Sequence, residues 1–329
     1  MVDNLKKDIR ALIENYTDRT DIDYLQDFIW SAVKYYRDEA EPEEIKPLKE
    51  GLDEIRRAIR MFKPYKYRPK ISIFGSARTK KDHVLYDLTK NFAYMAKKLG
   101  YMIITGGGLG IMQAGNMGAG ADNSFGLGLD LSFECINEIF INKPNHMTMF
   151  NNFYSRKMTF YRESQAIIVM PGGYGTMDEI FQGLASMQTG KLKIRPFILL
   201  DEENGSFWNS FDDWMKANVL KNEYIDLGDL CLYSIHYSVD DVFSEIQNFY
   251  KYFFSYFLFD NHLIFQLKIK LSEEQLNELN FFSRKYKLDD FVFLRERYYN
   301  KSNLYVYQTK VNCVDMVNIK RLIIALNKL

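Results

Sequence analysis

Apolar residues in the first part of the chain recur every three or four positions, which is the spacing of a helix buried along one face. Three such stripes occupy residues 5–16, 25–36 and 48–62. The segment KPYKYRPK that follows carries two prolines, and proline interrupts a helix because it lacks an N–H donor. The pattern predicts a helical extension over residues 1–68, which a linker joins to the next unit.

From residue 69 the pattern changes to short, fully apolar runs that alternate with amphipathic segments. ISIFGSA, YMIITGGG, QAIIVMPGG and RPFILLD have the length and composition of buried strands, and the segments between them have helical spacing. Strand and helix in alternation are typical of a parallel sheet that is covered by helices. We therefore predict an α/β domain with a doubly wound parallel sheet over residues 69–258.

Residues 259–329 follow a different order. The runs HLIFQLKI, FVFLRE and NLYVYQTK have strand composition, whereas SEEQLNELNFFSRKYK and VDMVNIKRLIIALNKL have helical spacing. This β-α-β-β-α order predicts a small α+β appendage. The aromatic and β-branched residues of LYVY (304–307) suit ordinary strand packing, and they also suit an assembly surface or a regulatory site.

The charges of the chain balance, since 43 basic side chains face 43 acidic ones among 329 residues. This balance argues against nucleic acid or an anionic membrane as the main partner. The three cysteines and four histidines are scattered, so we expect no disulfide framework, no metal site and a cytoplasmic location. The N-terminus lacks the hydrophobic centre of a signal peptide, and YKYFFSYFLFD is too short to cross a bilayer.

Several predicted strands end in small residues, and parallel sheets bind their ligands at the carboxyl ends of strands. One strand runs into Gly75 and Ser76, and another runs into a turn that contains Gly107 and Gly108. The second turn, GGGLGIMQAG, matches neither the dinucleotide-binding nor the P-loop fingerprint. It is either a tight strand–helix junction or an anion site at the amino end of a helix.

The stretch VMPGGYGTMDEI is the most informative. Gly172, Gly173 and Gly175 form a turn between a strand and a helix, and Thr176 with Glu179 three positions later matches a capping box. On one interpretation Glu179 closes the first turn of its own helix. On the other, its carboxylate lies beside a ligand that the glycine turn binds.

The helix with the sequence SRKMTF offers neighbouring cations, Arg156 and Lys157. Such a pair usually lies on a solvated helix face. Arg156 can also make a bidentate contact with a phosphate or a carboxylate. Further on, Gly190 in QTGK is the expected C-cap of a helix.

Taken together, these motifs resemble a known family. GSAR, TGGGLGIMQAGNMGAGA, FYSRKMTF, PGGYGTMDEIF and LASMQTGK occur in the order and spacing of the LOG family (Lonely Guy, cytokinin-activating phosphoribohydrolases). Members of this family are often labelled "possible lysine decarboxylase". The similarity covers residues 70–250 and is closest to the longer bacterial members. Residues 131–135 read LSFEC, with Glu134 retained, where the family has an LPFEQ-like segment.

The resemblance implies a Rossmann-like homodimer that needs no cofactor and hydrolyses the N-glycosidic bond of a nucleoside 5′-monophosphate, such as AMP or an N6-modified AMP. The products would be a free nucleobase and ribose 5-phosphate. On this chain Arg156 and Glu179 match the catalytic pair. The family's binding positions are matched by Gly75, Ser76, Gly107, Gly108, Lys157, Gly172, Gly173, Gly175 and Thr176.

A second function is compatible with the same residues. A nucleotide-sensing module of the same fold would bind a nucleotide without converting it. The presence of both Arg156 and Glu179 favours the enzyme, because a sensor does not need the pair. An NAD-dependent dehydrogenase is disfavoured, because the dinucleotide-binding fingerprint is missing.

Overall fold

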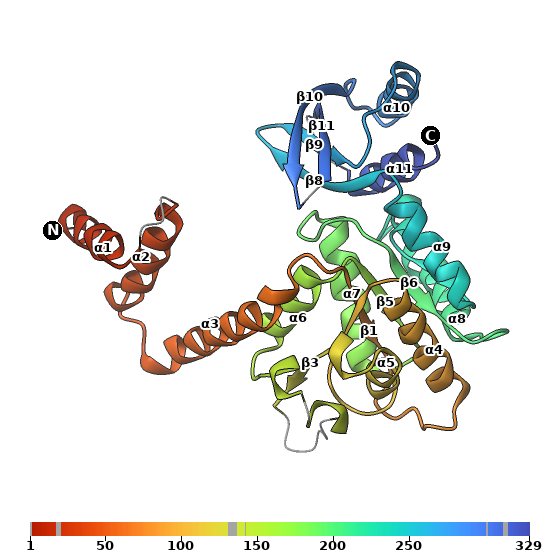
Figure 1. Ribbon diagram of the computed structural model, residues 1–329, viewed down its shortest axis with the longest axis horizontal. Coiled ribbons are helices and arrows are strands. Elements are labelled where there is room, and N and C mark those ends of the chain that lie inside the picture. Colours follow the sequence, from red (N-terminus) through yellow and green to blue (C-terminus); the bar gives the residue numbers. More distant parts are fainter. Residues whose placement is uncertain (1, 18–20, 131–136, 142, 301, 312–314) are drawn as a thin grey trace.

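The computed structural model of the protein describes residues 1–329 except 1, 18–20, 131–136, 142, 301 and 312–314. Figure 1 shows a helical arm that projects at the N-terminus, a central α/β layer structure, and a small C-terminal sheet packed with helices. The predicted fold class is confirmed. Nowhere in the described ranges does a helix have the length and apolar character needed to cross a membrane.

The central sheet is parallel throughout and nearly all of its residues are buried. Helices cover both of its faces, which is why its strands are apolar runs rather than alternating ones. In spatial order the strands are β4 (Met147–Phe150), β3 (Ser124–Leu129), β2 (Met102–Thr105), β1 (Lys70–Phe74), β5 (Ala166–Val169), β6 (Phe197–Leu200) and β7 (Ser234–His236).

Successive strand residues point to opposite faces of the sheet. Ile71 and Ile73 pack on one side, and Ile167 and Val169 pack on the other. The first side is covered by α4 (Val84–Lys98), α5 (Ile111–Ala119) and α9 (Val239–Phe249). The second side is covered by the end of α3 (Pro42–Phe62), α6 (Phe153–Glu163), α7 (Tyr174–Gln188) and α8 (Phe207–Trp214).

The direction of the chain connections reverses beside β1. From β1 the chain moves through α4 to β2 on one side, whereas from β5, on the other side of β1, it moves through α7 to β6. Connections that diverge in this way leave a crevice at the carboxyl ends of the two strands, where open α/β sheets bind ligands. The turns after β1 and β5 touch there, because the amide of Ser76 donates to the carbonyl oxygen of Pro171 over 3.2 Å.

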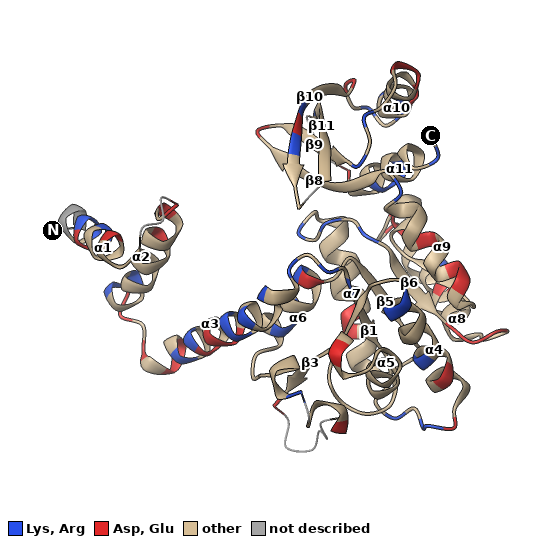
Figure 2. Ribbon diagram, viewed as in Figure 1, with Lys and Arg blue, Asp and Glu red and all other residues tan. Residues whose placement is uncertain are grey.

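The arm consists of α1 (Val2–Tyr16), α2 (Asp23–Arg37) and the first half of α3. Charged residues of both signs alternate along α3 (Figure 2), and Lys49 pairs with Asp53 one turn later at 2.9 Å. The second half of α3 is different, because its Ala58 and Phe62 are buried in the core of the α/β domain. The arm is therefore anchored to that domain by a shared hydrophobic core.

The C-terminal appendage is an antiparallel sheet flanked by α10 (Glu273–Lys285) and α11 (Met316–Leu326). The side chain of Asn327 accepts hydrogen bonds from the amides of Tyr252 (2.7 Å) and Phe253 (3.1 Å), and it donates to the carbonyl of Phe249 (2.7 Å). These bonds fix the end of α11 to the junction between the two sheets. In order, the strands are β10 (Val292–Tyr299), β11 (Ser302–Lys310), β9 (His262–Leu267) and β8 (Phe253–Phe259).

The predicted element order needs correction at β4, β7 and β8. The edge strands β4 and β7 are only partly buried, so they lack the continuous apolar run that marks the inner strands. Strand β8 forms a hairpin with β9 around Asp260 and Asn261, both of which have positive φ. The sheet and helices of the appendage therefore follow the order β-β-α-β-β-α, with β8 as the first strand.

Candidate active site

A pocket of about 900 Å³ opens at the carboxyl ends of the parallel strands, and we call it the carboxyl-edge pocket. It lies at the crevice between β1 and β5. Its wall comes from the turns after β1, β2 and β5 and from α6, α7 and α8. The predicted site residues that line it are Gly75, Ser76, Arg156, Gly172, Gly173, Gly175, Thr176 and Glu179.

The three glycines of the turn after β5 differ in what surrounds them. A Cβ at Gly172 would lie 2.9 Å from the amide nitrogen of Ser76 and 2.1 Å from the hydroxyl of Thr176. Packing between the two turns therefore requires glycine at this position. At Gly173 and Gly175 a Cβ would meet nothing within 4 Å, so these two glycines leave open space on the pocket side.

The predicted capping box is wrong. Helix α7 begins at Tyr174 with Gly173 as its N-cap, and no side chain accepts a hydrogen bond there. Thr176 lies within the first turn, where its amide and that of Met177 both donate to the carbonyl of Gly173 over 3.0 Å. The amides ahead of them are those that a helix leaves without an intrahelical partner. They lie at the positive end of the helix dipole, which favours an anion.

Glu179 lies on the second turn of α7, and only 4% of its surface is exposed. Its carboxylate accepts a hydrogen bond from the hydroxyl of Tyr161 at 3.2 Å, and the same hydroxyl lies 2.8 Å from the carbonyl oxygen of Glu179. Burial raises the pKa of Glu179 above its ordinary value, and the charges of Arg156 and Lys157 oppose that rise. Glu179 thus lines the carboxyl-edge pocket, and its side chain makes no capping bond at the amino end of its own helix.

Arg156, on α6, is held from two sides. Its Nε donates to the carbonyl of Leu127 at 2.7 Å, and its guanidinium lies over the ring of Phe160 at 5.3 Å from the centroid. A Cβ at Gly106 would lie 2.7 Å from its Nη2 atom. The glycine after β2 therefore gives the guanidinium its place beside the pocket.

A buried carboxylate from outside the α/β domain supports the start of α6. Glu54 of α3 is 1% exposed, and it accepts hydrogen bonds from the amide of Asn151 at 2.7 Å and from the hydroxyl of Ser155. Ser155 directly precedes Arg156. Helix α3 is thus connected to the pocket through the helix that carries the guanidinium, which the helical pattern of residues 48–62 did not predict.

Some predicted site residues lie elsewhere. Gly107 and Gly108 do not line the pocket, and Gly107, at φ +78°, is packed against Met147. Lys157 also lies outside the lining, and its ammonium group pairs with Asp178 at 2.5 Å between α6 and α7. The LSFEC segment, with Glu134, falls outside the described residues.

Other lining residues were not predicted. Gly106 directly precedes the predicted site residues Gly107 and Gly108. It makes room for the guanidinium of Arg156, and sequence spacing does not give the position of that group. Arg78 is an exposed cation at the pocket, and its position two residues after Ser76 in GSAR could have indicated it. Across the described ranges, no three histidine, cysteine, aspartate or glutamate side chains come together as a set of metal ligands.

The fold and the pocket define an α/β protein with an anion-compatible site at the switch point of its sheet. Residues 109–246 match the family model described as "Possible lysine decarboxylase". This segment is therefore a domain of that family, the LOG family, and the resemblance seen in the sequence is confirmed there. None of the curated proteins matches the chain.

Solved structures with a similar fold have low sequence identity to this chain. The molybdenum cofactor binding protein from the phototrophic bacterium Rippkaea orientalis is 15% identical, with a TM-score of 0.40, over 55% of this chain and 96% of its own. The molybdenum cofactor carrier protein from Chlamydomonas reinhardtii is 15% identical, with a TM-score of 0.38, over 55% and 96%. DNA processing protein A from Helicobacter pylori is 14% identical, with a TM-score of 0.37, over 55% and 81%.

Proposed function

We propose that the protein is a nucleoside 5′-monophosphate N-glycosidase, which hydrolyses its substrate to a free nucleobase and ribose 5-phosphate. The observation that carries the proposal is the position of Glu179. Its buried carboxyl group lines the carboxyl-edge pocket, one helical turn away from an anion-compatible glycine turn and close enough to Arg156 for that charge to act on its pKa.

The substrate phosphate is bound, on this proposal, at the amino end of α7. The open glycines 173 and 175 let its oxygens approach the backbone amides, and Ser76 and Arg78 lie on the facing turn. Such binding is remote from the bond that breaks. It contributes to the rate by holding the ribose in a fixed place against the reacting groups.

The chemical step is the exchange of a C–N bond for a C–O bond at the anomeric carbon. The electron pair of the breaking bond leaves with the base, water adds its oxygen to the sugar, and a proton from that water ends on the base. The sugar passes through an oxocarbenium-like state, as in glycoside hydrolysis. An ionised Glu179 would stabilise that positive charge or orient the water, and Arg156 would keep the carboxylate ionised.

The test is a product assay on the full chain. AMP, CMP, GMP and an N6-modified AMP are incubated with the protein, and the free base and ribose 5-phosphate are both measured. We expect the two products in equal amounts from at least one substrate. If no base is released from any of them while nucleotide binding is retained, hydrolysis is refuted.

A nucleotide-sensing module is the second candidate, and one observation favours it. Burial raises the pKa of Glu179 and thus favours the protonated form of this carboxyl group, whereas charge stabilisation in a hydrolase requires the ionised form. A nucleotide that raises the melting temperature without releasing base would support the sensor.

We also propose that the chain forms a homodimer or a larger homo-oligomer. The arm exposes large apolar side chains, among them Leu12 (66% exposed), Phe28 (48%) and Leu52 (44%), which a second copy would cover. Light scattering on the eluted full chain measures the mass. A monomer at every concentration tested would contradict this proposal.

A further inference from the structure

A second pocket, of about 420 Å³, lies at the opposite edge of the parallel sheet, and we call it the amino-edge pocket. Pro69, Tyr101, Gln165 and Arg195 contribute to it, and each of them comes shortly before the start of a parallel strand. The other wall is the beginning of β8 and Lys268, which belong to the C-terminal appendage. The pocket is therefore formed by the docking of the appendage on the α/β domain.

The charged residues that line this pocket are all cationic among the residues that the structure describes. Lys193, Arg195 and Lys268 line it, and none of the lining residues is acidic along the part of the chain that the structure describes. Loss of hydration lowers the pKa of all three groups, and no carboxylate acts against that shift. Three cations around one cavity without a carboxylate create a positive potential, which a bound anion would neutralise.

Two of the cations keep donors that can serve a ligand. The Lys193 ammonium donates to the hydroxyl of Ser255 at 3.2 Å, and the Lys268 ammonium donates to the carbonyl of Tyr250. An ammonium group has three N–H donors, so each lysine has further donors to offer. Both side chains are exposed, as required for a site that fills from solvent.

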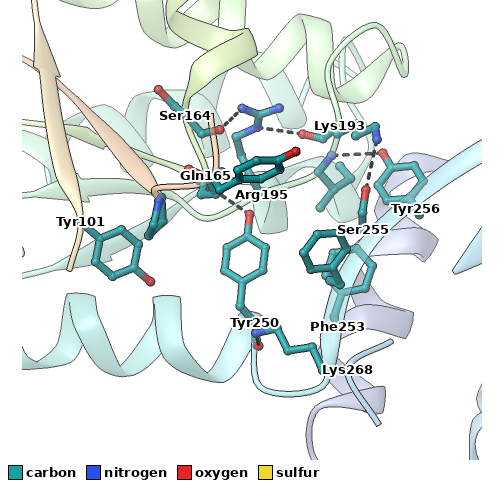
Figure 3. A pocket seen from close by; sticks show the side chains of 14 residues that line it. Tyr101, Ser164, Gln165, Lys193, Arg195, Tyr250, Phe253, Ser255, Tyr256 and Lys268 are labelled. Atoms are coloured by element: carbon teal, nitrogen blue, oxygen red, sulfur yellow. Dashed lines mark hydrogen bonds between the residues drawn. The ribbon is translucent and has the colours of Figure 1, made fainter. Parts of the chain in front are cut away.

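Aromatic rings form the rest of the wall, as Figure 3 shows for Tyr101, Tyr250, Phe253 and Tyr256. Several of these rings are fixed by hydrogen bonds. The hydroxyl of Tyr250 donates to the carbonyl of Gln165 at 2.8 Å, and that of Tyr256 accepts from the amide of Ile194 at 3.1 Å. Rigid rings beside cations suit a ligand with both a planar ring and a negative group. The volume is within the range of small-molecule sites.

We propose that the amino-edge pocket is a second ligand site, which binds a small organic phosphate that carries a planar ring, of the size of a mononucleotide. The phosphate lies between Lys193 and Lys268, and the ring packs against the aromatic wall.

Arg195 connects this site to α6. It donates to the carbonyls of Tyr161 (2.5 Å) and Ser164 at the carboxyl end of that helix, where a positive charge also complements the helix dipole. The ligand binding proposed for the amino-edge pocket is independent of the hydrolysis proposed for the carboxyl-edge pocket.

Calorimetric titration of the full chain with AMP, GMP, CMP and UMP tests the proposal. The parent is Glu179→Gln, so that turnover adds little heat. We expect at least one nucleotide to occupy two sites per chain, whereas adenosine and inorganic phosphate, each of which lacks half of the recognised chemistry, bind at least tenfold more weakly to the second site. In this parent, Lys193→Glu or Lys268→Glu should abolish binding in the amino-edge pocket. Arg156→Ala should instead weaken binding in the carboxyl-edge pocket.

Lys191→Glu is the matched control, because Lys191 is an exposed lysine two positions away that does not line the pocket. Circular dichroism checks that each variant is folded. The proposal is overturned if no mononucleotide fills a second site, or if the charge reversals at 193 and 268 leave the titration identical to that of the control. Absence of base release by the wild type, with the second site still filled, would refute the hydrolase and leave this inference standing.

Discussion

At the carboxyl edge of the parallel sheet the chain places glycines, and at the amino edge it places aromatic rings and cations. Gly173 and Gly175 face open space, so backbone amides can meet a ligand directly. At the other edge Tyr250 and Arg195 are tied to neighbouring carbonyls, and the amide of Ile194 donates to the hydroxyl of Tyr256 across the junction with the appendage. The first pocket is lined by turns and helices of the α/β domain, whereas the second lies between that domain and the appendage.

This difference predicts that substitution of Arg195 at the amino edge mainly lowers stability, whereas substitutions at the carboxyl edge mainly lower activity. Arg195→Met should show the largest loss of stability. Arg195 is 8% exposed and donates to the carbonyls of Tyr161, Ser164 and Lys193, and the first two carbonyls belong to buried residues that would lose this partner. We expect the free energy of unfolding to fall by about 3 kcal/mol. Urea denaturation measures it, and an equal fall in the exposed control Lys191→Met would contradict this explanation.

Glu179→Gln should lower activity and leave folding intact. We expect turnover of the best nucleotide to fall by about a hundredfold, which is the typical contribution of an acid–base group, with folding and nucleotide binding retained. Steady-state kinetics measure the loss. Asp178→Asn is the matched control, because this neighbouring carboxylate is half exposed and pairs with Lys157 outside the pocket. Equal losses in both variants would remove the special role of Glu179.

Gly175→Ala should weaken substrate binding without lowering the stability of the protein. A Cβ at this position meets no other atom within 4 Å, so the fold accepts it, and alanine favours a helix over glycine. If the phosphate lies against this backbone, the methyl group displaces it and KM rises by about tenfold, as for one lost hydrogen bond. A raised or equal melting temperature together with an unchanged KM would place the phosphate elsewhere.

Tyr161→Phe should move the pH dependence of activity by a small amount. The hydroxyl of Tyr161 donates to the Glu179 carboxylate and thereby lowers the pKa of Glu179 against the larger effect of burial. Without it the pKa rises further, and the acid limb of the pH–rate profile moves to higher pH. Tyr233→Phe, which removes a different buried phenol hydrogen bond, should leave the limb in place. A shift to lower pH would contradict the assignment.

Glu179 should also leave a small signature in stability. Because its pKa is raised in the folded state, the folded protein holds this proton more tightly than the unfolded chain does. The contribution of Glu179 to the free energy of unfolding is therefore greatest below the ordinary pKa of glutamate. This contribution falls as the pH rises through the raised pKa. Glu179→Gln should remove that part of the decline. Melting curves of both proteins between pH 4 and pH 8 would show the difference, and parallel curves would argue against it.

The sequence alone determined the inner strands of the α/β domain and the helices between them, because buried parallel strands are short apolar runs and most of these strands end in glycine turns. It also indicated Arg156 and Glu179 through motifs close to each other in the chain. It did not indicate β4 and β7, whose partial burial leaves no apolar run, and it misassigned Thr176 to the N-cap, because capping depends on backbone angles that residue type does not fix.

Contacts between distant segments were decided by the tertiary structure. Glu54 reaches the helix of Arg156 across almost a hundred positions, and Gly106, rather than Gly107, faces the guanidinium. The amino-edge pocket brings together Lys193 and Lys268, which no spacing rule connects. Propensity and hydrophobic period act over a few residues, so they specify elements and turns. Which charged groups meet across the fold depends on how those elements pack.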